Sequence, residues 1–366
     1  MQDRIEKPIF VTQPSLPPLN EYLRILEGVW ERGILTHNGP LVQQLEKELI
    51  KYLNVENLVA VTSGTIAIQL AIRALSLEGE IITTPFTWIA TASSIMWERC
   101  KPVFVDVDPD TFNIDPKKIE EKITDKTSAI LPVHVFSNPC DVDAIQEIAD
   151  KYNLKVIYDA AHAMCVQYKG RSILEYGDIS ATSFHATKIF QSGEGGACVT
   201  ADKKLSDRIR RLRFFGHDES KDIVDEGMNG KMTEIHAALG LANLKWLDDV
   251  LRNRRGKYEL YMTLLGKSGS VKFQKFPPGS YNYSYMPVLF EDEKQMLSVV
   301  DRLNKHNVFP RRYFYPALNT IEVLSVNERF PVAEDLASRI ICLPLYYTLD
   351  RKEIEYICKI IVGATQ

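Results

Sequence analysis

The chain has 366 residues, of which 45% are hydrophobic and 25% are charged, a balance that is ordinary for a globular protein with a large and a smaller domain. Its formal net charge of -4 gives no electrostatic reason to expect nucleic acid or an anionic membrane as a partner. No apolar run approaches the roughly 20 residues that cross a bilayer, and residues 1–10 lack the apolar core of a signal peptide, so we expect a cytoplasmic protein.

Short β-rich runs alternate with helical patterns through the first two thirds of the chain. In chain order we expect strands at residues 58–62, 80–84, 103–105, 129–133, 156–158, 179–183 and 197–200, and helices at residues 66–75, 91–97 and 141–152, with a further helix beginning at Asp115. This alternation predicts an α/β fold with a mostly parallel sheet covered by helices on both faces. Ligands of such sheets bind beyond the carboxyl ends of the strands, where Ser63, Asp159 and Ser183 lie, so we expect one shared site there.

The pattern changes near residues 239–257, which predict one long helix with mixed apolar and basic residues. We place the domain change there, with a large domain at residues 1–245 and a smaller α+β domain at residues 246–366. The smaller domain is expected to contain a strand at 284–290, a helix at 294–304 and a loop or strand edge at 310–316. Four prolines in residues 8–18 predict an extended N-terminal arm.

The segment from residue 156 to residue 200 carries the clearest indication of chemistry. One apolar run ends on Asp159, and a second leads through His185 to Lys188, which is followed by a glycine-rich turn at residues 193–196. A lysine can form a Schiff base with pyridoxal phosphate (PLP), and an acid can keep the pyridinium nitrogen of that cofactor protonated. Taken singly, Lys188 would be read as a solvated charge and Asp159 as a helix cap. Together, at the ends of neighbouring strands, they indicate PLP chemistry.

An ordered series of motifs resembles the DegT/DnrJ/EryC1/StrS family of sugar aminotransferases. The series is T-H-N-G-P at 36–40, V-T-S-G-T at 61–65, P-F-T-W-I-A-T at 85–91, P-V-F-V-D-V-D at 102–108, D-A-A-H-A at 159–163 and S-F-H-A-T-K at 183–188. The resemblance implies a PLP-dependent transferase of fold type I, which is aspartate aminotransferase-like. It also implies a mostly parallel, seven-stranded sheet in the large domain and a smaller α+β domain at the C-terminus.

The resemblance further implies roles for residues around the cofactor. The backbone N–H groups of Gly64 and Thr65, at the start of a helix, are expected to bind the phosphate, and Ser183 adds a hydroxyl to the same group. Trp88 is expected to stack on the pyridine ring, and His162 to contact the ring face or its 3'-oxygen. Without the resemblance, each of these residues would be read as a cap, as packing or as part of the core.

Asn229, in G-M-N-G-K-M, matches a family asparagine that reaches across a dimer to the phosphate held by the other subunit. Taken alone, N-G is only a turn signal. The resemblance therefore implies an obligate homodimer in which each active site is built from two subunits.

The substrate-side residues rest on weaker signals. R-R-Y-F-Y-P, at residues 311–316, combines two guanidinium groups with aromatic rings, which suit a diphosphate and a sugar or nucleobase but suit an ordinary basic surface strand equally well. The family often carries an H-Y-x-P-like segment here, and the departure resembles the branch that makes dTDP-4-amino-4,6-dideoxyglucose. The substrate-binding candidates are Thr36, Asn38, His185, Arg311, Arg312 and Tyr315.

The expected reaction moves an amino group from L-glutamate to a nucleotide-linked keto-deoxysugar, with dTDP-4-dehydro-6-deoxyglucose as the favoured acceptor, in the synthesis of a surface glycan such as a lipopolysaccharide O-antigen. Four alternatives stay open: amination at C3, a UDP- or GDP-linked sugar, a PLP-binding regulator without turnover, and a dehydratase, against which the presence of Lys188 weighs. No metal is expected, because His134, His162 and His185 are not at ligand spacing and the six cysteines form no C-x-x-C pair.

Overall fold

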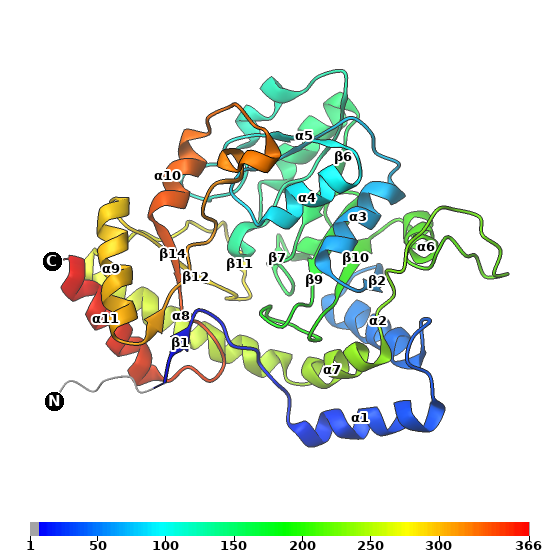
Figure 1. Ribbon diagram of the computed structural model, residues 1–366, viewed down its shortest axis with the longest axis horizontal. Helices are drawn as coiled ribbons and strands as arrows, with labels where there is room; N and C mark the ends of the chain where they lie inside the picture. The colour runs from blue at the N-terminus through cyan, green and yellow to red at the C-terminus, as the bar shows by residue number, and fades with distance from the viewer. Residues whose placement is uncertain (1–6, 366) are drawn as a thin grey trace.

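A seven-stranded sheet lies at the centre of the N-terminal part of the chain in the computed structural model, which describes residues 7–365 (Figure 1). Its strand order is β2 (Asn57–Val61), β10 (Gly196–Thr200), β9 (Ile179–Ser183), β6 (Lys155–Asp159), β5 (Thr127–Ile130), β3 (Glu80–Thr83) and β4 (Lys101–Phe104). All neighbouring strands are parallel except β10, which is antiparallel to both β2 and β9. The mostly parallel, seven-stranded sheet expected of fold type I is therefore confirmed.

Helices cover both faces of this sheet. Successive residues of each strand point to opposite faces, so apolar side chains on both faces need to be covered. On β2, Leu58 and Ala60 belong to one hydrophobic core, whereas Val59 and Val61 belong to another. The helices of the first core are α2 (Pro40–Leu53), α5 (Val142–Tyr152) and α7 (Glu234–Leu244), and those of the second are α3 (Gly64–Ala74), α4 (Ile89–Trp97) and α6 (Lys203–Leu212). The apolar runs of the sequence are thus buried from both sides.

The C-terminal part of the chain has a hydrophobic core of its own. The main elements of this part of the chain are α8 (Leu247–Ser268), α9 (Glu293–Lys305), α10 (Pro331–Arg339), α11 (Arg351–Thr365) and the antiparallel pair β12 (Met286–Leu289) and β14 (Ile340–Leu343). The smaller sheets are the parallel pair β1 (Ile9–Phe10) and β13 (Val308–Phe309), and the three strands β7 (Gln167–Tyr168), β8 (Arg171–Ser172) and β11 (Gly279–Ser280). Residues 1–245 and 246–366 remain our proposal for the two domains.

Two expected helices differ from those in the structure. The single helix predicted at 239–257 is instead two helices, α7 and α8, which are separated at Lys245 and Trp246. The break lies where the chain leaves its packing against α1 and α2 and begins to pack against α11. The helix expected from Asp115 consists only of the 3-10 turns Pro116–Lys118 and Glu120–Lys122, because the chain then turns directly into β5.

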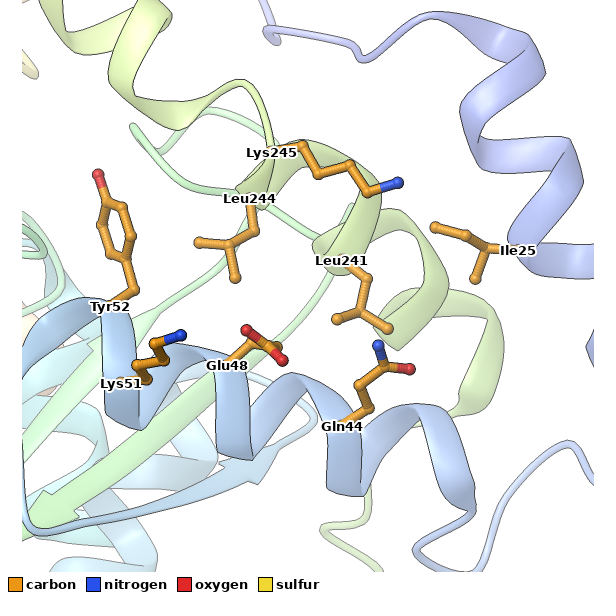
Figure 2. Close-up of a pocket in the computed structure, with 8 residues that line it drawn as sticks. All are labelled: Ile25, Gln44, Glu48, Lys51, Tyr52, Leu241, Leu244 and Lys245. Atoms are coloured by element: carbon orange, nitrogen blue, oxygen red, sulfur yellow. The ribbon is translucent and has the colours of Figure 1, made fainter.

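The N-terminal helix α1 (Leu19–Arg32) lies below α7 in Figure 1, beside the body of the large domain. It follows the proline-rich arm, which contributes β1 and is otherwise irregular. A cavity of about 580 Å³ lies between α1, α2 and α7, and Figure 2 shows Lys245 reaching across it toward α1, where its amine donates to Glu21 at 3.0 Å. Residues 1–6, on which part of the signal-peptide inference rests, lie outside the described residues. Within residues 7–365 no helix combines the length and apolarity of a membrane span.

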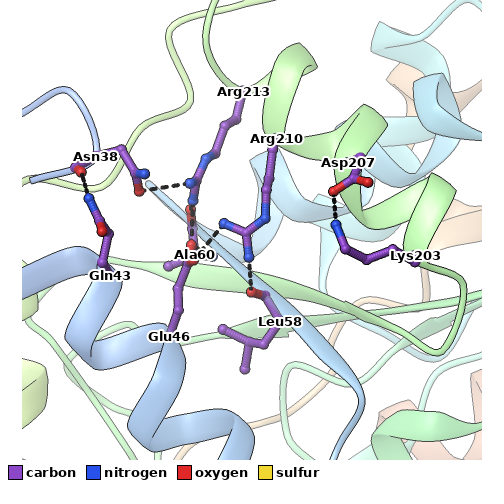
Figure 3. Close-up of polar contacts among 9 residues, drawn as sticks. All are labelled: Asn38, Gln43, Glu46, Leu58, Ala60, Lys203, Asp207, Arg210 and Arg213. Carbon is purple, nitrogen blue, oxygen red and sulfur yellow. Dashed lines mark hydrogen bonds and ion pairs between the residues drawn. The ribbon is translucent and has the colours of Figure 1, made fainter. Parts of the chain in front are cut away.

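A buried ion cluster joins four segments of the large domain (Figure 3). The carboxylate of Glu46 on α2 lies 2.6 Å from a guanidinium nitrogen of Arg213, at the end of α6, and 2.6 Å from one of Arg210. The Glu46 and Arg213 side chains are only 6% and 4% exposed. Arg213 also donates to the carbonyl of Ala60 on β2 and to Oδ1 of Asn38, at 2.5 and 2.9 Å. The cluster therefore fixes the loop that contains Asn38 against the sheet.

Glu46→Ala is expected to lower the free energy of unfolding of the cofactor-free protein by about 3 kcal/mol, because it leaves a buried guanidinium without its carboxylate. Chemical denaturation followed by circular dichroism measures this change. The matched control is Asp207→Ala, which removes the exposed ion pair with Lys203 that Figure 3 also shows. We expect that control to change the free energy by less than about 1 kcal/mol, and equal losses in the two variants would contradict the role of the cluster.

Candidate active site

A cavity of about 290 Å³ lies at the carboxyl ends of β6 and β9 and is also lined by residues within 285–314 of the C-terminal part of the chain. Ten residues that the sequence analysis named line it: Ser63, Gly64, Thr65, Trp88, Asp159, His162, Ser183, His185, Lys188 and Arg311. The larger cavity in Figure 2 shares no lining residue with it. The strand-end argument therefore located a real cavity, into which one acid, one amine and one helix N-terminus converge.

Asp159 is the last residue of β6, and both its backbone N–H and its carbonyl are hydrogen-bonded to the segment that follows β5. Its N–H donates to the carbonyl of Pro132 at 2.9 Å, and its carbonyl accepts from the N–H of His134 at 3.1 Å. The buried carboxylate accepts hydrogen bonds from Thr91 Oγ1 at 2.8 Å and from the Ala161 N–H at 3.1 Å. Burial raises the pKa of Asp159, while these hydrogen bonds and the charge of Lys188 act in the opposite direction.

Lys188 follows β9 and brings its amine into the same cavity. Burial lowers the pKa of this amine to about 8, against the opposing effect of the Asp159 charge. The amine donates a hydrogen bond to the hydroxyl of Tyr285 at 3.3 Å. At slightly alkaline pH the amine is therefore neutral in a substantial fraction of molecules, which is the form that attacks an aldehyde.

The N-terminus of α3 lines the cavity and offers a binding site for an anion. Ser63 caps the helix by accepting a hydrogen bond from the Ile66 N–H at 3.2 Å, so Gly64 and Thr65 occupy the first turn, where backbone N–H groups lack intrahelical acceptors. A Cβ placed on Gly64 would lie 2.9 Å from Cβ of Ser183. The glycine thus lets β9 approach the helix and brings the Ser183 hydroxyl beside a positive dipole end.

His162 is already part of an aromatic wall. Its ring is parallel to those of Phe136 and Phe314, with centroid distances of 6.2 and 5.9 Å, and its Nδ1 accepts from the Phe136 N–H at 3.3 Å. Burial lowers its pKa well below the usual histidine range, so the ring is neutral. Trp88 also lines the cavity, is half exposed and ends the loop before α4.

Arg311 is an unpaired cation at the rim of the cavity. Its guanidinium lies 5.6 Å from the ring centroid of Trp88 and 4.8 Å from that of Tyr313, and within residues 7–365 no carboxylate lies at ion-pair distance from it. Its backbone is fixed by two hydrogen bonds with Cys342 on β14, at 2.8 and 3.2 Å. A cation at a cavity rim that contacts aromatic rings and, among the described residues, no carboxylate suits an anionic ligand.

The remaining sequence candidates do not line this cavity. Arg312 turns away from it, donates to Glu293 at 2.6 Å and covers the ring of Tyr315 at 3.4 Å. Asn38 is engaged with Arg213, and Asn229 accepts a hydrogen bond from Lys231 at 2.5 Å. Thr36, Asn38, Asn229, Arg312 and Tyr315 stay predictions, because a single chain does not test a contact made across a dimer.

Sequence reasoning missed several residues of the cavity wall. Tyr285, Tyr313 and Phe314 line it from the C-terminal domain, and Glu194 lines it from the large one. Thr91 is fully buried and contributes only through its hydrogen bond to Asp159. Glu194 lies in the glycine-rich turn, 3.7 Å from Nε2 of His185. Thr91, Glu194 and the pair Tyr313 and Phe314 fell within segments that the sequence had singled out, namely P-F-T-W-I-A-T, the turn at 193–196 and R-R-Y-F-Y-P. Tyr285 alone among these residues lay outside every motif and had no local signal.

The chain is similar in sequence and in structure to known proteins over nearly its whole length. The chain is 45% identical over 360 residues to dTDP-4-amino-4,6-dideoxy-D-glucose transaminase of Shigella dysenteriae, covering 96% of this chain and 98% of the relative. DesI, crystallised in the presence of its TDP-sugar product, superposes with a TM-score of 0.93 at 31% identity and covers 99% of this chain and 94% of its own. NtdA from Bacillus subtilis, solved with its bound cofactor PMP, superposes with a TM-score of 0.87 at 28% identity, covering 95% and 82% of the two chains.

The fold and the site define a PLP-dependent aminotransferase. The profile of the DegT/DnrJ/EryC1/StrS aminotransferase family matches residues 20–362, and the chain belongs to this family. The expected enzyme class and cofactor are therefore confirmed. The residues present fit PLP, because the cavity offers an amine with a lowered pKa, a buried carboxylate and a glycine-formed helix terminus for a phosphate.

Capture of PLP by the cofactor-free protein is expected to accelerate with pH between about 7 and 9 and then level off, because only the neutral amine of Lys188 is nucleophilic and its pKa is about 8. Borohydride reduction followed by peptide mapping measures which lysine carries the cofactor. Lys257, whose pKa burial also lowers to about 8, is the matched control outside the cavity. Label on Lys257 instead, or capture that persists in Lys188→Ala, would contradict the assignment.

Proposed function

We propose that this enzyme transfers the amino group of L-glutamate to dTDP-4-dehydro-6-deoxyglucose and forms dTDP-4-amino-4,6-dideoxyglucose for surface-glycan synthesis in the cytoplasm. The observation that carries the proposal is the joint placement of Lys188 and Asp159 in one cavity whose rim presents the unpaired guanidinium of Arg311. The similarity to a transaminase of this specificity over nearly the whole of both chains supports the choice of sugar.

Seven residues of the cavity would hold the cofactor. The N–H groups of Gly64 and Thr65 and the Ser183 hydroxyl would bind its phosphate, Asp159 would keep its pyridine nitrogen protonated, and Lys188 would anchor it covalently. Trp88 and His162 would contact the ring, and His162 would do so as a neutral imidazole that adds no charge near Asp159. When bound, PLP supplies an electron sink that makes the α-proton of an amino acid acidic.

The residues of the chain supply the proton transfer and the binding of both substrates. Once it is not covalently engaged, the Lys188 amine takes the α-proton of glutamate and later gives a proton to the sugar side of the reaction. The hydrogen bonds that Asp159 accepts from Thr91 and Ala161 stabilise the charged form of its carboxylate. Arg311 attracts the anionic part of either substrate, which is a carboxylate in glutamate and a diphosphate in the sugar nucleotide.

The proposed test follows the ¹⁵N of labelled L-glutamate into the sugar nucleotide by mass spectrometry. We expect dTDP-4-dehydro-6-deoxyglucose to gain the label with equimolar formation of 2-oxoglutarate, and Lys188→Ala to transfer none. Arg311→Met is expected to raise the KM for the sugar nucleotide by about 10- to 100-fold, because charge-assisted hydrogen bonds are lost.

The control for that variant is Arg312→Met, which removes the neighbouring guanidinium that faces Glu293 instead of the cavity. We expect it to change the KM much less than Arg311→Met. Labelling of the corresponding UDP- or GDP-linked sugar in preference, or of a 3-keto sugar, would contradict the proposed acceptor. Consumption of the sugar without 2-oxoglutarate would indicate dehydration.

We further propose a homodimer in which Asn229 completes the site of the other subunit. Lys188→Ala and Asn229→Ala are each expected to abolish or strongly reduce transfer. Refolding the two variants together places both defects in one site of a hybrid dimer and leaves its second site intact, so about a quarter of the sites regain activity. The same total amount of the two variants, mixed without refolding, is the control. No recovery after refolding would contradict a shared site.

A further inference from the structure

Tyr285 is a buried tyrosine whose hydroxyl is directed at the reactive amine. It lies just before β12 in the C-terminal domain, is 7% exposed and accepts a hydrogen bond from Nζ of Lys188 at 3.3 Å. Its ring is fixed from two sides, by His162 at a centroid distance of 4.7 Å and by Phe136 at 5.5 Å. The hydroxyl therefore has a defined position relative to the amine, with little rotational freedom.

A buried cation lies behind this tyrosine. Arg254 on α8 is 1% exposed, donates to the carbonyl of Ser284 at 3.1 Å and, within the described chain, has no carboxylate at ion-pair distance. Burial raises the pKa of Tyr285, and the positive charges of Arg254 and Arg311 only partly oppose this effect. The phenol is therefore protonated at neutral pH.

We propose that Tyr285 is a positioning residue for the aminotransferase reaction, whose hydroxyl holds the free Lys188 amine in the position from which that amine moves a proton. A lysine side chain that is not covalently engaged has four rotatable bonds, so without a partner its amine would sample many positions. The hydrogen bond that Nζ donates to the tyrosine oxygen leaves the nitrogen lone pair free to accept a proton.

The proton balance of this step is closed within the site. Lys188 accepts one proton from the α-carbon of the bound substrate, becomes an ammonium that still donates to Tyr285, and gives one proton up again in the same turnover. Tyr285 keeps its own proton throughout and acts as an acceptor that stabilises the ammonium. The role rests on the proposed role of Lys188, and it adds a residue that none of the sequence motifs contained.

The test begins with the cofactor-free protein. Acetylation of Lys188, followed by mass spectrometry between pH 6 and 10, reports the fraction of neutral amine, with Lys257 as internal reference. Tyr285→Phe is expected to lower the pH midpoint of Lys188 by about one unit, because the ammonium loses a hydrogen-bond acceptor. The other titratable or charged groups around the tyrosine, which the variant leaves in place, are His162, Asp159, Arg254, Arg311, Tyr313 and Cys342.

The second readout is the reaction itself. In single-turnover amino transfer from glutamate, Tyr285→Phe is expected to slow the rate constant about tenfold while the KM for glutamate changes less than about threefold, because the ring that encloses the site stays in place. The matched control is Tyr261→Phe, a buried tyrosine of the C-terminal core whose hydroxyl has no hydrogen-bond partner among residues 7–365. It is expected to leave both readouts unchanged.

Two outcomes would overturn the inference: a Lys188 midpoint equal to that of wild type in Tyr285→Phe, or an unchanged single-turnover rate. If Tyr285→Phe melts well below Tyr261→Phe, 3-fluorotyrosine at position 285 replaces it, since a more acidic phenol is a weaker acceptor and must shift the midpoint in the same direction. Because the midpoint is measured without cofactor or sugar, its outcome is independent of the proposed acceptor. Activity that survives Lys188→Ala would refute the proposed site and not Tyr285 alone.

Discussion

The site depends on holding one carboxylate and one amine out of bulk water at the same edge of a parallel sheet. Burial by itself favours the neutral form of each, raising the pKa of Asp159 and lowering that of Lys188. The hydrogen bonds from Thr91 and Ala161 and the charge of Lys188 favour the charged carboxylate and partly oppose the effect of burial on its pKa. A cofactor with a positive ring nitrogen and an aldehyde satisfies both groups at once, which explains why they lie together.

The sheet positions Asp159 and Lys188, and the C-terminal domain encloses the cavity around them. β6 and β9 are parallel neighbours, so the chain segments that follow them meet at one edge, and the N-terminus of α3 adjoins the same edge through Gly64. The C-terminal domain adds Tyr285 and the loop with Arg311, which is tied to β14 through Cys342. Any shift of the smaller domain would therefore move both Tyr285, which contacts the amine of Lys188, and Arg311 at the rim of the cavity.

The sequence predicted the parts of the site that lie at strand ends and helix starts, and it missed the parts that depend on packing between domains. Asp159, Ser183 and Gly64 follow from strand-to-turn patterns, which are local. Tyr285 is 97 residues from Lys188 and meets it only in the folded chain, so no spacing could indicate the contact. For the same reason the sequence treated Arg311 and Arg312 alike, although backbone pairing with β14 directs one toward the cavity and leaves the other facing Glu293.

The predicted helix boundaries were wrong where tertiary packing overrides a continuous sequence pattern. At Lys245, for example, one predicted helix is two helices in the structure.

The central claim is that Lys188 and Asp159 hold PLP in this cavity, and a crystal structure of the enzyme with PLP tests it most directly. The account predicts continuous electron density between Nζ of Lys188 and the cofactor, with the Asp159 carboxylate at hydrogen-bond distance from the ring nitrogen. Cofactor joined to a different lysine, or a ring nitrogen with no carboxylate beside it, would contradict the account.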